Sequence, residues 1–463
     1  MRIRTVLAIG IASAIACSAP TPTVSVSATP TVASASSPSS VVPSPSTTPS
    51  LLPTAAPRPP AEAIVVTTVA LGPLHGQIAW VSRLVSNPNT PGPAGTPSLA
   101  TYELWAMPLD GSAPRMAARY QSAVTGGLGV PPGPGPRSLV DSRRDTNVLR
   151  RQFSPDGRQI ALSVAANAGV LDQELRVVNL ETGAVAMPVP FNSFPAASQF
   201  DVNPVWSPDG AHIAFVALSS SGTSGELWVM NPDGGGATRL WVGCNACQPS
   251  SSLIHIATAP PRIYGWLPGS QRIAFDPAPS GQGAYAVIDL NGETSPAGAF
   301  QVTSVDPASW GSASQMFVVG ARQAGLPADR SQVLRGDGPE QHSLQVIADV
   351  TVNPNDNNVT GVHDPRWDPQ GSRMLVYLES GVQGSLVLAD LDARTSKQLS
   401  SRVAYADWMS NGDGIVTLEV HPATAPLSVY VYERDGRLRA QPPPLVIPND
   451  TRNVLTDLAA RAY

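Results

Sequence analysis

Cys244 and Cys247 form the chain's only Cys-x-x-Cys pair, and this spacing is compatible with three kinds of chemistry. A disulfide bracing a loop is the main expectation, because disulfides are typical of exported proteins. A redox dithiol would need a helix N-terminus to activate the thiol, whereas Gln, Pro and Ser residues follow this pair. A zinc site would need two further ligands, and only His255 is close in sequence.

A second candidate site consists of acidic residues that precede aromatic residues. Asp306, Asp364 and Asp407 lie in successive copies of a repeated segment, and His363 is adjacent to Asp364. Acids that converge at about 5 to 10 Å are the arrangement that glycoside hydrolases use. The alternative reading is that these aspartates only begin strands or form turns.

Other catalytic or metal-binding patterns are weak. The six histidines are scattered, with no H-E-x-x-H or H-x-H pattern, so we expect no metal centre. Residues 353–360 are rich in asparagine and could hold calcium, but Asp356 is their only acid, which favours a turn-rich loop. There is no G-x-S-x-G nucleophile elbow. We therefore expect no cofactor and no enzymatic activity.

The N-terminus carries the features of an export signal. Residues 1–16 combine Arg2 and Arg4 with an apolar run of about ten residues, too short to span a membrane. The run ends in Ala-Ile-Ala-Cys17, which resembles the bacterial lipobox. That resemblance implies lipidation of Cys17 and an anchor on the extracytoplasmic side of the cell membrane or outer envelope. Ordinary signal cleavage, with Cys17 incidental, is the alternative.

Residues 17–61 predict a disordered stalk. Beyond Cys17 they are almost entirely Ser, Thr, Pro, Ala and Val, without a charge before Arg58. Such a segment cannot bury enough apolar surface to offset the entropy of ordering its backbone. A tether that holds a folded domain away from a membrane follows from this composition, and a Pro-rich recognition ligand is the sharper alternative.

The rest of the chain, residues 62–463, consists of repeats. The clearest copy, residues 203–240, contains Asn-Pro-Val-Trp206-Ser-Pro-Asp-Gly210, then Ile-Ala-Phe215, then Leu-Trp-Val-Met230. The Ser-Pro-Asp-Gly segment predicts a tight turn, because proline presets φ, aspartate binds local amides and glycine accepts positive φ. The apolar segments on either side of it predict strands.

Aromatic residues mark the copies at intervals of roughly 40 to 60 residues, the period of four-stranded propeller blades. These anchors are Phe153, Trp206, Trp266, Trp310, Trp367 and Trp408. Together with a degenerate first copy they predict an all-β fold, a single β-propeller of about seven four-stranded blades, with six or eight possible. The repeat resembles that of the TolB-type, WD-repeat-like propeller family, which implies a binding role.

The sequence allows two ways in which the ring could close. Residues 63–69 could be the innermost strand of the first blade, leaving residues 445–447 as the outer strand of the seventh. They could instead complete the last blade. The alanine-rich tail, residues 453–462, predicts one short helix.

Composition excludes one class of partner. The formal net charge is −5, so nothing indicates a basic surface for nucleic acid. We expect a monomeric, lipid-anchored module that binds an envelope or extracellular protein, peptide or glycan. The alternative, from the acids above, is an extracellular carbohydrate hydrolase or lyase.

Overall fold

The computed structural model describes twenty segments of the chain, all within the compact unit Thr54–Tyr463. They are 66–85, 99–123, 149–165, 173–188, 198–219, 225–242, 261–267, 269–276, 284–299, 309–310, 316–320, 330–336, 344–351, 361–369, 373–380, 383–390, 393, 395–419, 427–445 and 454–463. No helix in these segments has the length and apolar character needed to cross a membrane. The predicted boundary between stalk and propeller, at residue 61, lies outside them.

The first sheet joins the two ends of the propeller. Its antiparallel strands, in sheet order, are β1 (Val66–Thr68), β4 (Arg115–Ala123), β3 (Leu99–Pro108), β2 (Gln77–Val85) and β27 (Val454–Ala462). The tail expected to be helical is therefore a strand, and that prediction was wrong. Residues 66–68 pair with β4 at the opposite edge of the sheet, so neither expected placement of this segment is correct.

The second sheet contains two groups of strands. One group is preceded by the short helix α2 (Leu149–Gln152) and comprises β5 (Gln159–Ala165), β6 (Gln173–Asn179) and β7 (Val185–Ala186). The other comprises β8 (Ser198–Trp206), β9 (Ile213–Ser219), β10 (Gly225–Met230) and β11 (Thr238–Val242). The groups are joined through one parallel pair of residues, Gln173 and Phe200.

The third and fourth sheets are simple four-stranded meanders. The third contains β12 (Arg262–Trp266), β13 (Arg272–Asp276), β14 (Ala284–Asp289) and β15 (Thr294–Ala299). The fourth contains β16 (Ser309–Trp310), β17 (Met316–Gly320), β18 (Arg330–Gly336) and β19 (Leu344–Thr351).

The fifth sheet has seven strands, and one long strand connects its two halves. Its members are β20 (Gly361–Trp367), β21 (Arg373–Ser380), β22 (Gln383–Asp390), β23 (Thr395–Trp408), β24 (Gly414–Glu419), β25 (Ser428–Glu433) and β26 (Leu438–Ala440). The first part of β23 pairs with β22, and its last part, from Val403, pairs with β24.

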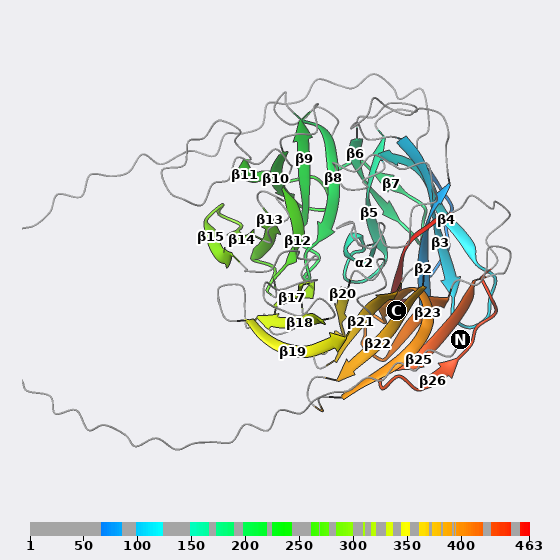
Figure 1. Cartoon of the computed structure of the whole chain (residues 1–463). Helices are drawn as coiled ribbons and strands as arrows, with labels where there is room; N and C mark the ends of the chain where they lie inside the picture. The colour runs from blue at the N-terminus through cyan, green and yellow to red at the C-terminus, as the bar shows by residue number, and fades with distance from the viewer. Residues whose placement is uncertain are drawn as a thin grey trace, which may run out of the picture. The chain divides into compact units, whose positions relative to one another are not determined.

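Contacts between sheets follow a closed order. β4 lies against β5, β8 against β12, β12 against β16, β16 against β20, and β23 against β27, which belongs to the first sheet. Figure 1 shows the sheets following one another from blue strands β2 to β4, through green, to orange strands β21 to β25. The fold is thus an all-β propeller. The described strands form five sheets, so seven blades stay a prediction.

Strand β9 shows how the repeats pack. Ile213 and Phe215 join a buried cluster with Leu175 of the preceding group of strands. Ala214 and Val216 point the other way, into a cluster that contains Ile273 of the third sheet. Because successive side chains of a strand alternate between its faces, a strand covered on both sides is apolar at consecutive positions, as β9 is from Ile213 to Ala217.

The Ser-Pro-Asp-Gly turn has the predicted conformation. The amide of Gly210 donates to the carbonyl of Ser207 at 2.9 Å, and the hydroxyl of Ser207 donates to Asp209 at 2.6 Å. Gly210 has φ of 73°, a region that favours glycine. His212, which follows this turn, stacks on Trp266, with 6.0 Å between the two ring centroids.

Candidate functional site

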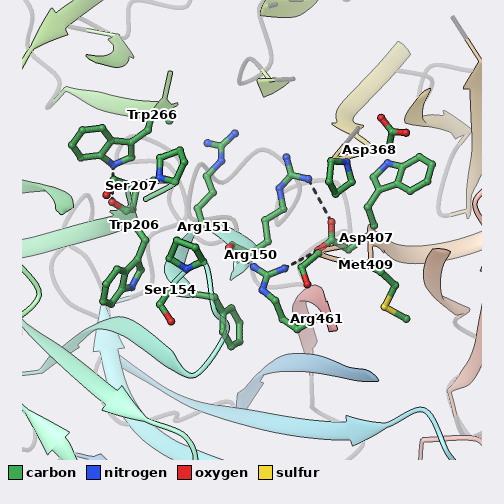
Figure 2. A pocket seen from close by; sticks show the side chains of 18 residues that line it. Arg150, Arg151, Ser154, Trp206, Ser207, Trp266, Asp368, Asp407, Met409 and Arg461 are labelled. Atoms are coloured by element: carbon green, nitrogen blue, oxygen red, sulfur yellow. Dashed lines mark hydrogen bonds and ion pairs between the residues drawn. The ribbon is translucent and has the colours of Figure 1, made fainter. Parts of the chain in front are cut away.

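A cavity of about 340 Å³ lies where the first strands of several repeats end. Its wall is built from α2 and the residues after it, the ends of β8 and β12, the turn after β20, the end of β23 and Arg461 of β27. Figure 2 shows side chains from these segments pointing toward one another. Strand ends held in a packed ring are rigid supports for a site, and such pockets are the default candidates for ligand binding.

Helix α2 brings cationic side chains to this cavity. The amide of Leu149 donates to a carboxylate oxygen of Asp457 in β27 at 2.8 Å. Leu149 and Gln152 are buried, whereas Arg150 and Arg151 line the cavity. In Figure 2 these two arginines extend side by side from α2.

Asp407 is the acid around which the arginines gather. Its side chain is 2% exposed, and it lies 3.5 Å from Arg150, 3.6 Å from Arg366 and 3.9 Å from Arg461. Arg150 and Arg366 lie nearest its Oδ1, whereas Oδ2, the oxygen nearest Arg461, accepts a hydrogen bond from the amide of Ala460 at 3.1 Å. One buried carboxylate thus serves three guanidinium groups and a backbone amide.

Side chains from the fifth sheet, and Ser410 just after β23, form hydrogen bonds with β27. Arg366 donates to the carbonyl of Leu458 at 3.2 Å and to Asp457 at 3.0 Å. Ser410 accepts from the amide of Ala462 at 2.9 Å. An open strand edge would leave buried backbone groups unpaired, so these contacts stabilise the closure of the ring.

Arg461 is a buried cation that lines the cavity. Its guanidinium lies over the ring of Phe153, 4.9 Å from the centroid. Burial lowers the pKa of Arg461, and Asp407 opposes this effect. The site therefore contains a buried positive charge whose nearest carboxylate is shared.

Two of the aromatic anchors, Trp266 and Trp408, form hydrogen bonds across the junctions between repeats. Nε1 of Trp266 donates to the carbonyl of Val205 at 3.0 Å, and Nε1 of Trp408 donates to that of Arg366 at 2.8 Å. In both pairs the acceptor immediately precedes an anchor of the neighbouring repeat. Trp206 is next to a repeat that begins with α2, and among the described residues its buried Nε1 has no hydrogen-bond acceptor.

One of the sequence-predicted channel residues is at this site. Asp407 lines the cavity, whereas His363 and Asp364 belong to β20 and their side chains are not described. Asp306 is outside the described residues, as are Cys17, Cys244 and Cys247. Convergence of the acids therefore stays a prediction.

Sequence reasoning missed the arginines and Asp457. One signal was available, because Arg366 and Asp407 each stand immediately before an anchor tryptophan, at the same position of the repeat. Arg150 and Arg461 come from the N- and C-terminal parts of the ring, and no spacing connects them.

Metal ligands are not grouped in the described segments, which contain no cluster of three His, Cys, Asp or Glu residues able to hold a metal ion. The asparagine-rich residues 353–360, considered for calcium, lie outside these segments.

A second cavity, about 740 Å³, lies beside the first sheet and is lined by His75, Asp110 and Arg115, among others. Local structure already engages two of these side chains. Arg115 donates to the carbonyl of Leu71 at 2.9 Å, and Asp110 accepts from the amide of Ser112 at 2.8 Å. This cavity is the weaker candidate.

No protein-family model matches the chain, and no curated protein matches it. Among solved structures it is similar to TolB from Acinetobacter baumannii, with 18% identity, 69% of this chain covered and a TM-score of 0.39. The chain spans 62% of the length of that protein.

Two further similar structures are of other kinds of protein. The β-propeller domain of the Trilobed protease from Pyrococcus furiosus has 13% identity and a TM-score of 0.48, with 84% of this chain and 100% of that one covered. An oligogalacturonate lyase in complex with manganese has 14% identity and a TM-score of 0.40, with 63% and 75% covered. The repeats of the sequence and the closed order of its sheets make this chain a β-propeller.

Proposed function

We propose that the protein is a non-enzymatic binding module of the cell envelope, with its ligand held in the cavity around Asp407. The observation that carries this proposal is the cavity itself, formed by strand ends from several repeats and lined by charged groups. A small, rigid, charged hollow of about 340 Å³ suits one or a few side chains of a partner, or a short sugar unit.

Asp407 supports binding over catalysis. A general acid or base needs a carboxyl group that can exchange a proton with the substrate, and Asp407 is committed to Ala460 and to three arginines. Asp457, the other nearby acid, is held by Arg366 and the amide of Leu149. A carbohydrate hydrolase or lyase remains the second candidate, and it would depend on Asp306 and Asp364.

The location proposed for this module follows from the N-terminal residues. Cys17 would carry the lipid, and residues 18–61 would hold the propeller away from the membrane. Metabolic labelling with a radioactive fatty acid tests this, with a Cys17→Ser variant as control. Label on the wild type alone supports the anchor, and equal label on both contradicts it.

Seven blades are also part of the proposal. The count is supported by β23, whose two halves pair with different strands, and by the single residue pair that joins the two groups of the second sheet. Each seven-stranded sheet would then hold two blades. An experimental structure of the ring tests the number directly.

The binding proposal is tested by blocking the cavity. Pro208 is exposed on its rim, and Leu438 is 57% exposed on β26, outside the cavity. We expect a Pro208→Trp variant of the full chain to lose an envelope component that the wild type retains in a pull-down. A Leu438→Trp variant should retain it.

Equal capture by both variants would contradict a site in this cavity. Turnover of an extracellular polysaccharide by the purified full chain, abolished by Asp364→Asn, would favour the hydrolase or lyase instead.

A further inference from the structure

The guanidinium of Arg461 has hydrogen-bonding capacity that the described structure does not use. The residue is 9% exposed, and its guanidinium donates to the carbonyl oxygens of Ala460, at 2.8 Å, and Arg150. A guanidinium has five N–H donors. Its nearest carboxylate oxygen within the described segments, on Asp407, is 3.9 Å away, beyond hydrogen-bond distance.

Asp407 does not provide hydrogen-bond acceptors for the unused N–H donors of Arg461. Charge-assisted hydrogen bonds between guanidinium and carboxylate groups are about 2.7 to 2.9 Å long, whereas Asp407 lies 3.5 Å from Arg150 and 3.6 Å from Arg366. Its shortest contact is with the amide of Ala460. The carboxylate sits between the guanidinium groups without closing a bidentate pair with any of them.

Arg461 has less charge compensation than its neighbour Arg366, which pairs with Asp457 at 3.0 Å. Burial lowers the pKa of Arg461, and the charges of Arg150 and Arg366 lower it further, against the opposing effects of Asp407 and Tyr463. A second carboxylate in the cavity would meet the free donors of Arg461 and offset its charge.

We propose that the cavity binds the carboxylate of an acidic peptide segment between Arg461 and Arg150, an inference that rests on the proposed binding function. Arg150 belongs to α2, which lies against β27, its side chain is 20% exposed, and the side chains of Arg150 and Arg461 both point toward Asp407 in Figure 2. Two guanidinium groups from different elements form a clamp that selects a planar carboxylate by geometry as well as by charge.

A peptide fits the walls better than an acidic sugar. Trp206, Trp266 and Trp408 line the cavity, but they are only 7%, 5% and 2% exposed. Their ring faces are packed between repeats and are not open platforms on which a pyranose ring could stack. A side chain such as glutamate needs only the space in front of the guanidinium groups.

Isothermal titration of the full chain in detergent tests the inference. The probe is an acetylated, amidated oligoglutamate peptide, compared with its oligoglutamine counterpart and with an oligogalacturonate. The net charge of the chain is −5, so general attraction of an acidic peptide is not expected.

We expect oligoglutamate to bind and oligoglutamine not to bind. Arg150→Gln should weaken oligoglutamate binding by about tenfold or more, as for loss of a hydrogen bond to a charged group. Arg437→Gln is the matched control, because Arg437 is 75% exposed and pairs with Asp435 outside the cavity. It should bind as the wild type does.

Arg461→Gln is a second variant whose fold must be checked by circular dichroism, since Arg461 also supports β27. Arg150→Gln keeps the test decisive if that variant unfolds.

Three results would overturn the inference: binding of oligogalacturonate but not oligoglutamate, equal binding of the glutamate and glutamine peptides, or wild-type affinity in Arg150→Gln. If no acidic probe binds while a partner is still captured in a Pro208-dependent way, the carboxylate site is wrong and the binding function stands. If capture also fails to depend on Pro208, both fail.

Discussion

The carboxylate of Asp407 in β23 accepts a hydrogen bond from the amide of Ala460 in β27 at 3.1 Å. This contact links the fifth sheet to the strand that completes the first sheet, so one buried acid both closes the ring and organises the arginines of the cavity. The stability of the fold and the chemistry of the site are therefore coupled at Asp407.

Asp407→Asn should lower the free energy of unfolding by about 3 kcal/mol, because removing one partner of a buried ion pair leaves uncompensated charge. Urea unfolding followed by circular dichroism measures the change. Asp413→Asn, in an exposed turn of the adjacent hairpin, is the control and should leave the midpoint unchanged. Equal effects of the two substitutions would show that Asp407 does not hold the ring.

The same substitution, Trp→Phe, should lower the unfolding free energy by different amounts at Trp266 and Trp206. Trp266→Phe removes the donor to the carbonyl of Val205 and should cost about 1 to 3 kcal/mol in unfolding free energy, because a buried acceptor is left unpaired. Trp206→Phe should cost less, because its Nε1 has no acceptor among the described residues. Thermal unfolding of both variants measures the difference, and a larger loss in Trp206→Phe would contradict the hydrogen bonding described.

Gly157 and Gly76 form a matched pair for the closing strand. Both have positive φ, 70° and 77°, so alanine is strained at either position. A Cβ at Gly157 would meet the ring of Tyr463 at 2.8 Å, whereas a Cβ at Gly76 meets nothing within 4 Å. Gly157→Ala should therefore destabilise the protein by about 1 kcal/mol more than Gly76→Ala. Equal midpoints in urea would place Tyr463 away from Gly157.

Alkaline pH should weaken the protein through Tyr463. Its hydroxyl donates to the carbonyl of Gly157 and accepts from Nε1 of Trp80, both at 3.1 Å. Burial raises the pKa of Tyr463 to about 12, above the value of about 10 in an unfolded chain. The folded state then holds its proton more tightly, so this contribution is complete below pH about 10 and is lost as the pH rises toward 12.

The measurement is unfolding free energy against pH in wild type and Tyr463→Phe. Between pH about 10 and 12 the wild type should lose stability more steeply than the variant, by up to about 1.4 kcal/mol per pH unit. Parallel curves would mean that Tyr463 titrates normally in the folded state.

The propeller was predictable from sequence because its packing is periodic. Trp206, Trp367 and Trp408 are each followed four residues later by a glycine. Consecutive buried residues, Ile213, Ala214 and Phe215, indicate a strand covered on both faces. Local residue types alone were sufficient for these features.

The tail could not be assigned in this way. Leu, Ala and Arg in residues 454–462 are good helix formers, yet the segment pairs with β2 and receives contacts from Asp407, Arg366 and Ser410. Tertiary pairing overrides propensity here. The arginine site depends on the same closure, since Arg461 reaches Arg150 only once the ring is complete.

A photo-cross-linking residue at Pro208, compared with one at Leu438, tests the central binding site most directly. In cells that make the full chain, we expect a discrete adduct with an envelope component from the Pro208 position alone, lost when Arg150 is also changed to Gln. Adducts of equal yield from both positions, or an adduct only from Leu438, would place the binding surface outside the cavity around Asp407.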